Sequence, residues 1–278
     1  MSSSQPWSGF GAPPTPYAIR GGLQGKRRLD LLHRVMWPTT APLLRRARIR
    51  RGMACLDMGC GGGHVTLALA RRVGPSGRVV GVDLDAVNIE AARRQAARRK
   101  LHHVHFHQAN IYAWPEEHAY DRIYVRFLLT HLPDREAAVS VLARALRPGG
   151  MLIIEDTDFV GSFSYPHCRA FERYVDLYRE VVRRRGGDPE IGPKLRALLV
   201  QAGLEPVDVA LVQPCHYDHE GKALHLSTLL NIADAVVAEN LADRAELDGA
   251  VAELAAFTDD PTTLLTLPRV FQACGRRP

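Results

Sequence analysis

The chain has 278 residues, 46% of them hydrophobic and 24% charged, with a formal net charge of +6. This length and apolar content suffice for one large α/β domain with an added lobe. No apolar run reaches the length of a membrane span, and residues 1–6 lack the basic start and apolar core of a signal peptide, so we expect no membrane partner. The five scattered cysteines are typical of reduced thiols, and we expect a cytoplasmic protein.

The first 50 residues contain a polar start and a helical segment. Residues 1–16 are rich in Ser, Pro and Gly, which predicts a flexible tail. Residues 17–50 are predicted to form an N-terminal helical cap, because apolar side chains recur with helical spacing over residues 24–48. Pro38 predicts a break in this helix and Pro42 its resumption.

A strand followed by a glycine turn and a helix is the most informative stretch. The buried strand expected at residues 54–58 contains Asp57, and Gly59, Gly61 and Gly63 follow it. Glycine has no Cβ, so such a turn lets the backbone approach a bound molecule closely. His64 stands where the third glycine of a dinucleotide fingerprint would fall. The turn therefore indicates a nucleoside ligand rather than a dinucleotide.

Further strands follow in the order of a doubly wound sheet. Residues 78–83 end at Asp83, where a carboxylate can accept both hydroxyls of a ribose. Residues 103–110 end at Asn110, whose amide can hydrogen-bond an adenine edge. Later in the chain we expect a strand at residues 120–126, a helix stop and turn at 146–150, and a strand at 151–156.

In these motifs the chain resembles the class I S-adenosylmethionine-dependent methyltransferases. The matching segments are residues 56–63, 81–83, 109–110, 120–121 and 146–150. The resemblance implies a Rossmann-like α/β fold with a seven-stranded, mostly parallel sheet and helices on both faces. It also implies S-adenosylmethionine as the cofactor and residues 51–278 as the methyltransferase domain. Many relatives have aspartate where Asn110 stands, but an amide oxygen can still accept from the adenine amino group.

The resemblance also implies roles for individual residues. Asp83 would bind the ribose hydroxyls, the glycine turn would surround the methionine and ribose part, and residues 109–111 would flank adenine. Tyr17 is added as a hypothesis, because the N-terminal segment could fold over the cofactor. The expected cofactor-binding residues are Tyr17, Asp57, Gly59, Gly61, Gly63, Asp83, Leu84, Ala109, Asn110, Ile111 and Val125.

After residue 160 the pattern changes to longer helical stretches. The helices expected are residues 166–185, 190–202, 222–238 and 243–257, and the strands are 205–213 and 264–274. By the resemblance, these strands complete the sheet and the last one is reversed. A helical lid, residues 160–187 and 216–260, would cover the carboxyl ends of the strands, where ligands of open α/β sheets bind. Its aromatic and aliphatic residues favour a small, partly apolar acceptor over a polymer.

Methyl transfer requires mainly positioning, and an acid or base is needed only if the acceptor loses a proton. His131, just after the fourth strand, would orient or deprotonate the acceptor or make a local hydrogen bond. Alternation puts Glu155 and Asp156 on opposite faces, so we expect only one at the cleft. Arg126 would bind an acceptor carboxylate or the methionine carboxylate, or form a structural ion pair. The candidate catalytic residues are His131, Arg126, Glu155, Asp156 and Asp158.

The basic balance keeps RNA methylation open as a second hypothesis. Arginine runs at residues 45–51, 93–100 and 183–185 could contact phosphates, but solvated helix faces explain them equally simply. Histidines on the strand at 103–110, and the Cys, His and Asp of residues 215–219, do not converge as a metal site requires, so we expect no metal.

These features predict methyl transfer from S-adenosylmethionine to a small, partly apolar molecule, with release of S-adenosylhomocysteine. The alternatives are an RNA methyltransferase and a non-catalytic module that uses the bound cofactor to shape a surface. A small-molecule partner is favoured over nucleic acid, and the oligomeric state stays open.

Overall fold

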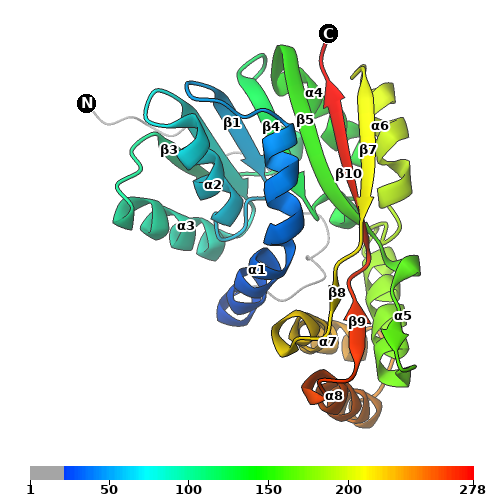
Figure 1. The fold of residues 1–278 in the computed structure, drawn as a ribbon. Coiled ribbons are helices and arrows are strands. Elements are labelled where there is room, and N and C mark those ends of the chain that lie inside the picture. The colour runs from blue at the N-terminus through cyan, green and yellow to red at the C-terminus, as the bar shows by residue number, and fades with distance from the viewer. Residues whose placement is uncertain (1–21) are drawn as a thin grey trace.

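The computed structural model describes residues 22–278, so the predicted tail at residues 1–16 and Tyr17 lie outside the described residues. A seven-stranded sheet with the order β3-β2-β1-β4-β5-β10-β7 forms its centre (Figure 1). Its strands are β1 (Ala54–Met58), β2 (Arg78–Asp83), β3 (Val104–Gln108), β4 (Tyr120–Arg126), β5 (Leu146–Asp158), β7 (Val207–Val212) and β10 (Arg269–Arg276). All pairs are parallel except those of β10, which runs antiparallel to β5 and β7. The predicted fold class is confirmed.

Helices cover both faces of this sheet. One face carries α1 (Gly22–Arg46), α2 (His64–Val73) and α3 (Ala86–Arg98), and the other carries α4 (Arg135–Ala145) and α6 (Leu195–Gln201). Cys55 packs with the first layer and its neighbour Leu56 with the second, as strand alternation requires. The central strands are therefore buried on both sides, which explains their continuous apolar runs.

α1 is one continuous helix, although the sequence predicts a break in it. Pro38 and Pro42 both lie inside it, and Figure 1 shows the helix bending rather than ending. Proline removes a backbone donor and presses on the preceding turn, which normally kinks or breaks a helix. Met36 and Thr40 in this stretch are fully buried. The predicted break is wrong, because packing against the rest of the protein keeps the helix continuous.

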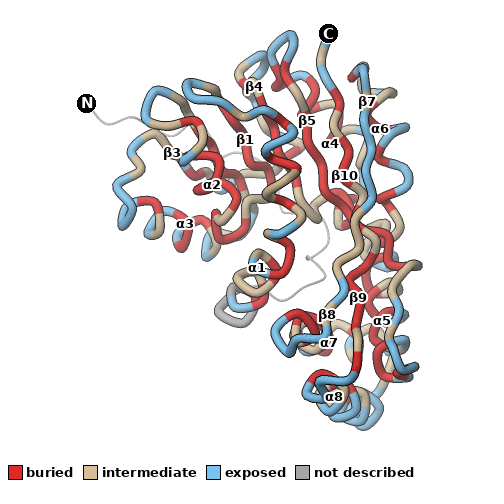
Figure 2. Tube along the Cα trace, in the orientation of Figure 1, coloured by how far each residue is buried: buried red, intermediate tan, exposed pale blue. Residues whose placement is uncertain are grey.

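The chain after β5 builds a helical lobe at the carboxyl ends of the parallel strands (Figure 1). The lobe consists of α5 (Arg169–Arg184), α7 (His219–Ala238), α8 (Arg244–Asp259) and a small sheet of β6 (Ser164–Tyr165), β9 (Leu264–Thr266) and β8 (Cys215–His216). Figure 2 shows buried positions inside the lobe as well as along the main sheet, so the lobe has its own apolar core. The predicted helices are confirmed. The single strand predicted at residues 264–274 is divided into β9 and β10, and the pairing of β9 with the two-residue strands β6 and β8 was not predicted, because strands that short leave no periodicity.

Short 3-10 helices connect several of these elements. They are η1 (Ile111–Ala113), η2 (Leu129–His131), η3 (Phe159–Gly161) and η4 (Gly192–Lys194). The turn predicted at residues 146–150 lies within the bounds of β5, where the pairing with β4 shifts register between Tyr120 and Arg122. Within residues 22–278, no helix combines the length and apolar character that crossing a bilayer demands.

Candidate functional site

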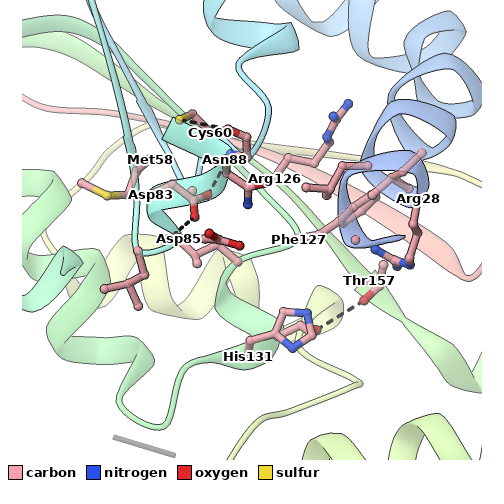
Figure 3. Close-up of a pocket in the computed structure, with 18 of the residues that line it drawn as sticks. Arg28, Met58, Cys60, Asp83, Asp85, Asn88, Arg126, Phe127, His131 and Thr157 are labelled. Carbon is pink, nitrogen blue, oxygen red and sulfur yellow. Dashed lines mark hydrogen bonds between the residues drawn. The ribbon is translucent and has the colours of Figure 1, made fainter. Parts of the chain in front are cut away.

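A cavity of about 560 Å³ lies among the carboxyl ends of the strands, α1 and the helical lobe. Figure 3 shows Asp83, Asp85 and Asn88 close together on one side of the view, and Arg28, Thr157 and His131 on the other. We call these two sides the strand end and the lobe end. The strand end is lined by Asp57, residues 59–62, Asp83, Leu84, Asp85, Asn88 and residues 109–111, and the lobe end by Arg28, His131, Thr157, Phe159, Tyr174, Tyr178, His225 and Thr228.

The glycine turn brings bare backbone to the strand end. Gly59 has a φ of 75°, and a Cβ there would lie 3.2 Å from the Leu128 side chain. Gly63 does not line the cavity. Its φ is 80° and its Cβ would lie 2.8 Å from that of Ala92, so glycine is needed there for packing between α2 and α3. The prediction that Gly63 contacts the ligand is therefore corrected to a packing role.

Asp83 joins the end of β2 to the glycine turn. Its Oδ2 accepts from the Gly61 N–H at 2.8 Å, and its Oδ1 accepts from the Asp85 N–H at 2.9 Å. Burial raises the pKa of this carboxyl, while these two hydrogen bonds oppose the shift. The Asn88 side chain is a third hydrogen-bond donor to this carboxylate, which leaves acceptor capacity for a further hydrogen bond from a ligand.

Asn110 is held by the chain that follows it. Its Oδ1 accepts from the Tyr112 N–H at 3.1 Å and so caps η1. The amide oxygen expected to face adenine is thus already engaged with the backbone, and its Nδ2 is the group left for a ligand. Ala109 and Ile111 line the cavity on either side of it, and Leu84 is 54% exposed at the rim.

Asp57 lies beneath the glycine turn, only 2% exposed. It accepts from the Thr66 hydroxyl at 2.6 Å, and burial raises its pKa to about 6. Arg126 at the end of β4 lines the cavity, and its charge acts on both Asp57 and His64. Its Nη1 lies 3.4 Å from the Thr40 hydroxyl. Within residues 22–278 no carboxylate lies within ion-pair distance of Arg126, which leaves its guanidinium available to a ligand.

The three carboxylates predicted after the fifth strand do not line the cavity. Glu155 is fully buried and accepts from Thr40 (2.7 Å), Tyr124 and Gln272 (2.8 Å). Asp156 accepts from the backbone N–H groups of Thr130 (3.2 Å) and Thr157 (2.9 Å), and Asp158 caps η3 and pairs with Arg269 at 2.6 Å. These catalytic predictions are wrong, because each carboxylate is already used to hold the fold together. Thr157, on the same face as Glu155, lines the cavity in their place.

Val125 is also misplaced by the sequence prediction. It is fully buried in the core on the α4 side, whereas its neighbours Tyr124 and Arg126 line the cavity. The alternation along β4 explains the difference, since adjacent residues point to opposite faces.

His131 is the last residue of η2 and lines the lobe end of the cavity, as predicted from its position after the fourth strand. Burial, with a smaller contribution from the charge of Arg28, lowers its pKa to about 3. His225 on α7 is 2% exposed, and burial followed by the charges of His216 and Arg28 lowers its pKa to about 3 as well. Both imidazoles are therefore neutral at neutral pH.

Three aromatic residues wall the lobe end. Phe159 stacks on Tyr178 with ring centroids 4.2 Å apart, and Tyr174 is buried beside them. Most of the other apolar residues of the lobe do not line the cavity. Phe171, Leu229 and Ile232 form its core, while Phe163, Tyr165 and Leu230 are at least half exposed.

Several cavity residues were missed by the sequence reasoning. They are Arg28 on α1, Asn88 on α3, Phe127 after β4, and His225 and Thr228 on α7. Only Phe127 has a local peculiarity, a φ of 53° that is rare for a bulky residue, and this is a property of the fold. None of them belongs to a sequence motif.

Two of the histidines noted in the sequence make local hydrogen bonds instead of converging on a metal ion. His103 bonds the Ala70 carbonyl at 3.1 Å, and His216 lies 3.2 Å from Asp218. Within residues 22–278 no three His, Cys, Asp or Glu side chains are grouped so as to hold a metal ion.

Comparison with known proteins relates part of this site to a family model. Residues 49–184 match the family model described as a methyltransferase domain. This part of the chain is therefore similar to a methyltransferase domain. This domain contains the whole strand end of the cavity and His131, whereas His225 and Thr228 lie beyond the matched residues.

Three individual relatives share 30% or less of their sequence with this chain over the matched residues. The demethylmenaquinone methyltransferase of Lactococcus lactis subsp. lactis is 30% identical over 128 residues, which cover 46% of this chain and 48% of that protein. The chain spans about half the length of the curated relatives it matches. Phosphoethanolamine N-methyltransferase 2 of Haemonchus contortus, solved with S-adenosyl-L-methionine, has a TM-score of 0.59 at 16% identity over 91% of this chain and 57% of its own. An S-adenosylmethionine-dependent methyltransferase from Aquifex aeolicus has a TM-score of 0.53 at 19% identity over 69% and 93% of the chains.

Proposed function

We propose that the protein transfers a methyl group from S-adenosylmethionine to a small, partly apolar molecule and releases S-adenosylhomocysteine. The observation that carries this proposal is a single cavity that joins nucleoside-binding groups at the strand end to aromatic walls at the lobe end. Its volume of about 560 Å³ falls within the range of small-molecule sites. Relatives named demethylmenaquinone methyltransferase support an apolar acceptor.

The residues at the strand end fit the cofactor. Asp83 is positioned to accept from the ribose hydroxyls, the open backbone at Gly59 admits close approach, and Ile111 offers an apolar surface to adenine. We assign the methionine carboxylate to Arg126, because its guanidinium lines the cavity at the end of β4 and has no carboxylate of residues 22–278 within ion-pair distance. When bound, S-adenosylmethionine supplies a methyl group already activated on a sulfonium.

The lobe end then has to position the acceptor and exclude water. His131 acts in this proposal as a neutral hydrogen-bonding group, because an imidazole with its pKa lowered to about 3 is a weak general base at neutral pH. The stacked pair Phe159 and Tyr178 provides a flat apolar wall. Holding the acceptor in line with the reacting bond can account for a large part of the rate acceleration.

The RNA alternative has less support. Arg183, Arg184 and Arg185, the run that most suggested phosphate contacts, each form an ion pair with a glutamate. Their charges are thus locally balanced instead of forming a uniformly positive face.

Calorimetric titration with S-adenosylmethionine and S-adenosylhomocysteine, with NAD as the control, tests the cofactor. We expect both adenosyl ligands to bind and NAD not to bind. A radiolabelled methyl-transfer assay with reduced demethylmenaquinone and with total RNA then tests the acceptor. Binding of neither adenosyl ligand would contradict the proposal, and binding without transfer to any small acceptor would favour the non-catalytic module.

A further inference from the structure

Arg28 brings a buried positive charge to the lobe end of the cavity. It lies on α1, is 8% exposed and lines the cavity. Its Nε donates to the Thr228 hydroxyl at 3.0 Å, and that hydroxyl donates to the Leu224 carbonyl at 2.7 Å. The guanidinium is therefore fixed in orientation by α7, the helix that packs against its own helix α1.

No carboxylate of the chain neutralises this charge. The ion pairs formed within residues 22–278 do not include Arg28, and its hydrogen bond with those residues is the one from Nε to Thr228. The first acidic residue in the sequence is Asp30, so every aspartate and glutamate belongs to the described part of the chain. A buried cation without a partner is costly, and an anion delivered by a ligand would offset that cost.

The neighbours of Arg28 are neutral groups able to support such an anion. Burial lowers the pKa of His131 and of His225 and the charge of Arg28 lowers it further, while the same charge opposes the rise that burial causes in the pKa of Tyr174. The Nε2 of His225 is buried and has no hydrogen-bond partner among residues 22–278. The ring of His225 is held edge-on to Phe171 and Tyr174, with centroids 5.0 and 5.7 Å apart. A second polar contact for the ligand thus lies beside the cation.

We propose that Arg28 binds an ionised oxygen of the methyl acceptor, a carboxylate, phenolate or enolate, with the apolar body of the acceptor against Phe159 and Tyr178. This inference rests on the proposed function. It assigns the anion to the acceptor and not to the cofactor, because Arg28 is fixed by α7 at the lobe end, whereas Arg126 serves the strand end. His225 provides the second contact to the same oxygen group.

Matched neutral and anionic probes test the inference. The full chain, saturated with S-adenosylhomocysteine, is titrated with benzoate against benzamide and with 2-naphthoate against 2-naphthamide. The variants are Arg28→Met, Arg28→Lys and, as the control, Arg27→Met, which removes an exposed arginine from the next position of α1. We expect the wild type and Arg27→Met to bind a carboxylate about 10- to 100-fold more tightly than its amide. Arg28→Met should lose this preference, and Arg28→Lys should keep part of it.

Equal affinity for acid and amide in the wild type, no binding of either carboxylate, or a preference that survives Arg28→Met would each overturn the inference. A companion titration compares S-adenosylhomocysteine with 5′-methylthioadenosine, which lacks the amino acid group. If Arg28→Met abolishes the tighter binding of S-adenosylhomocysteine relative to 5′-methylthioadenosine, Arg28 binds the cofactor carboxylate and the inference is also overturned. We expect Arg126→Met to abolish this tighter binding instead. Failure of the wild type to bind S-adenosylhomocysteine at all would contradict the proposed function itself, which separates the two failures.

Discussion

The two ends of the cavity differ in how their polar groups are satisfied. At the strand end, Asp83 and Asn110 are already bonded to backbone N–H groups, so the site is shaped before any ligand arrives. At the lobe end, Arg28 lacks a carboxylate and His225 keeps a buried nitrogen without a partner among residues 22–278. The strand end is thus stabilised by the fold alone, while the lobe end gains most from a ligand that supplies charge and hydrogen bonds.

The largest effect is expected behind the strand end, at Gly63, where the packing of α2 on α3 depends on a missing Cβ. Gly63→Val should destabilise the protein by about 4 kcal/mol, because it combines overpacking against Ala92 with a left-handed backbone that valine rarely adopts. Urea denaturation followed by circular dichroism measures this. The matched control is Gly249→Ala in α8, where a Cβ has nothing within 4 Å and should stabilise by about 0.5–1 kcal/mol. A loss under 1 kcal/mol for Gly63→Val would contradict the packing role assigned to Gly63.

Asp57 should make stability fall as the pH rises from about 4 to above 6. Its folded pKa of about 6 lies above the usual value of 3.8, so the folded state binds more protons in this window and loses about 3 kcal/mol across it. Below pH 4 the carboxyl is protonated in both states and the penalty vanishes. Asp57→Asn, which can still hydrogen-bond Thr66, should remove this contribution and leave the one from Asp156, whose pKa burial also raises to about 6. Unfolding free energies of both proteins at pH 4, 5, 6 and 7 decide the matter, and parallel curves would refute the assignment.

Substitutions of Asp83 and Tyr174 should distinguish the two ends of the cavity by their effects on cofactor affinity. Asp83→Ala should weaken binding of S-adenosylhomocysteine by about 1–3 kcal/mol, because the ribose hydroxyls lose a charged acceptor. Tyr174→Phe, at the lobe end, should leave that affinity unchanged. Calorimetric titration of both variants gives the comparison. Unchanged affinity in Asp83→Ala would remove the ribose assignment.

The smallest effect concerns the neutral histidines of the lobe end. Arg28→Met should raise the pKa of both His131 and His225, because the charge of Arg28 is one cause of lowering in each, although burial is the larger cause. Two-dimensional NMR of the imidazole nitrogens across a pH series measures the change, with Arg27→Met as the control. Identical titration in the wild type and Arg28→Met would show that Arg28 lies too far away to act on either ring.

Local chemistry made the strand end predictable from the sequence. Asp83, the glycine turn and Asn110 each sit at the end of a strand, and parallel strands bring their carboxyl ends to one edge. Even there, the sequence could not show that Gly63 serves packing or that the Asn110 oxygen caps η1. Both depend on neighbours that only the fold provides.

The lobe end was decided by tertiary structure. Arg28 and Thr228 meet across 200 residues of chain, and neither lies in a motif. Glu155, Asp156 and Asp158 had the right position along the sequence, yet α1, η2 and Arg269 engage them. By itself, the sequence predicted an α/β fold with a parallel sheet and a nucleoside-binding edge, because these follow from periodicity and from residues adjacent in the chain. The resemblance to a known family supplied the seven strands and the reversed last one. The packing of helices that are distant in the sequence decides which side chains face the acceptor, because burial and hydrogen-bond partners depend on the tertiary structure.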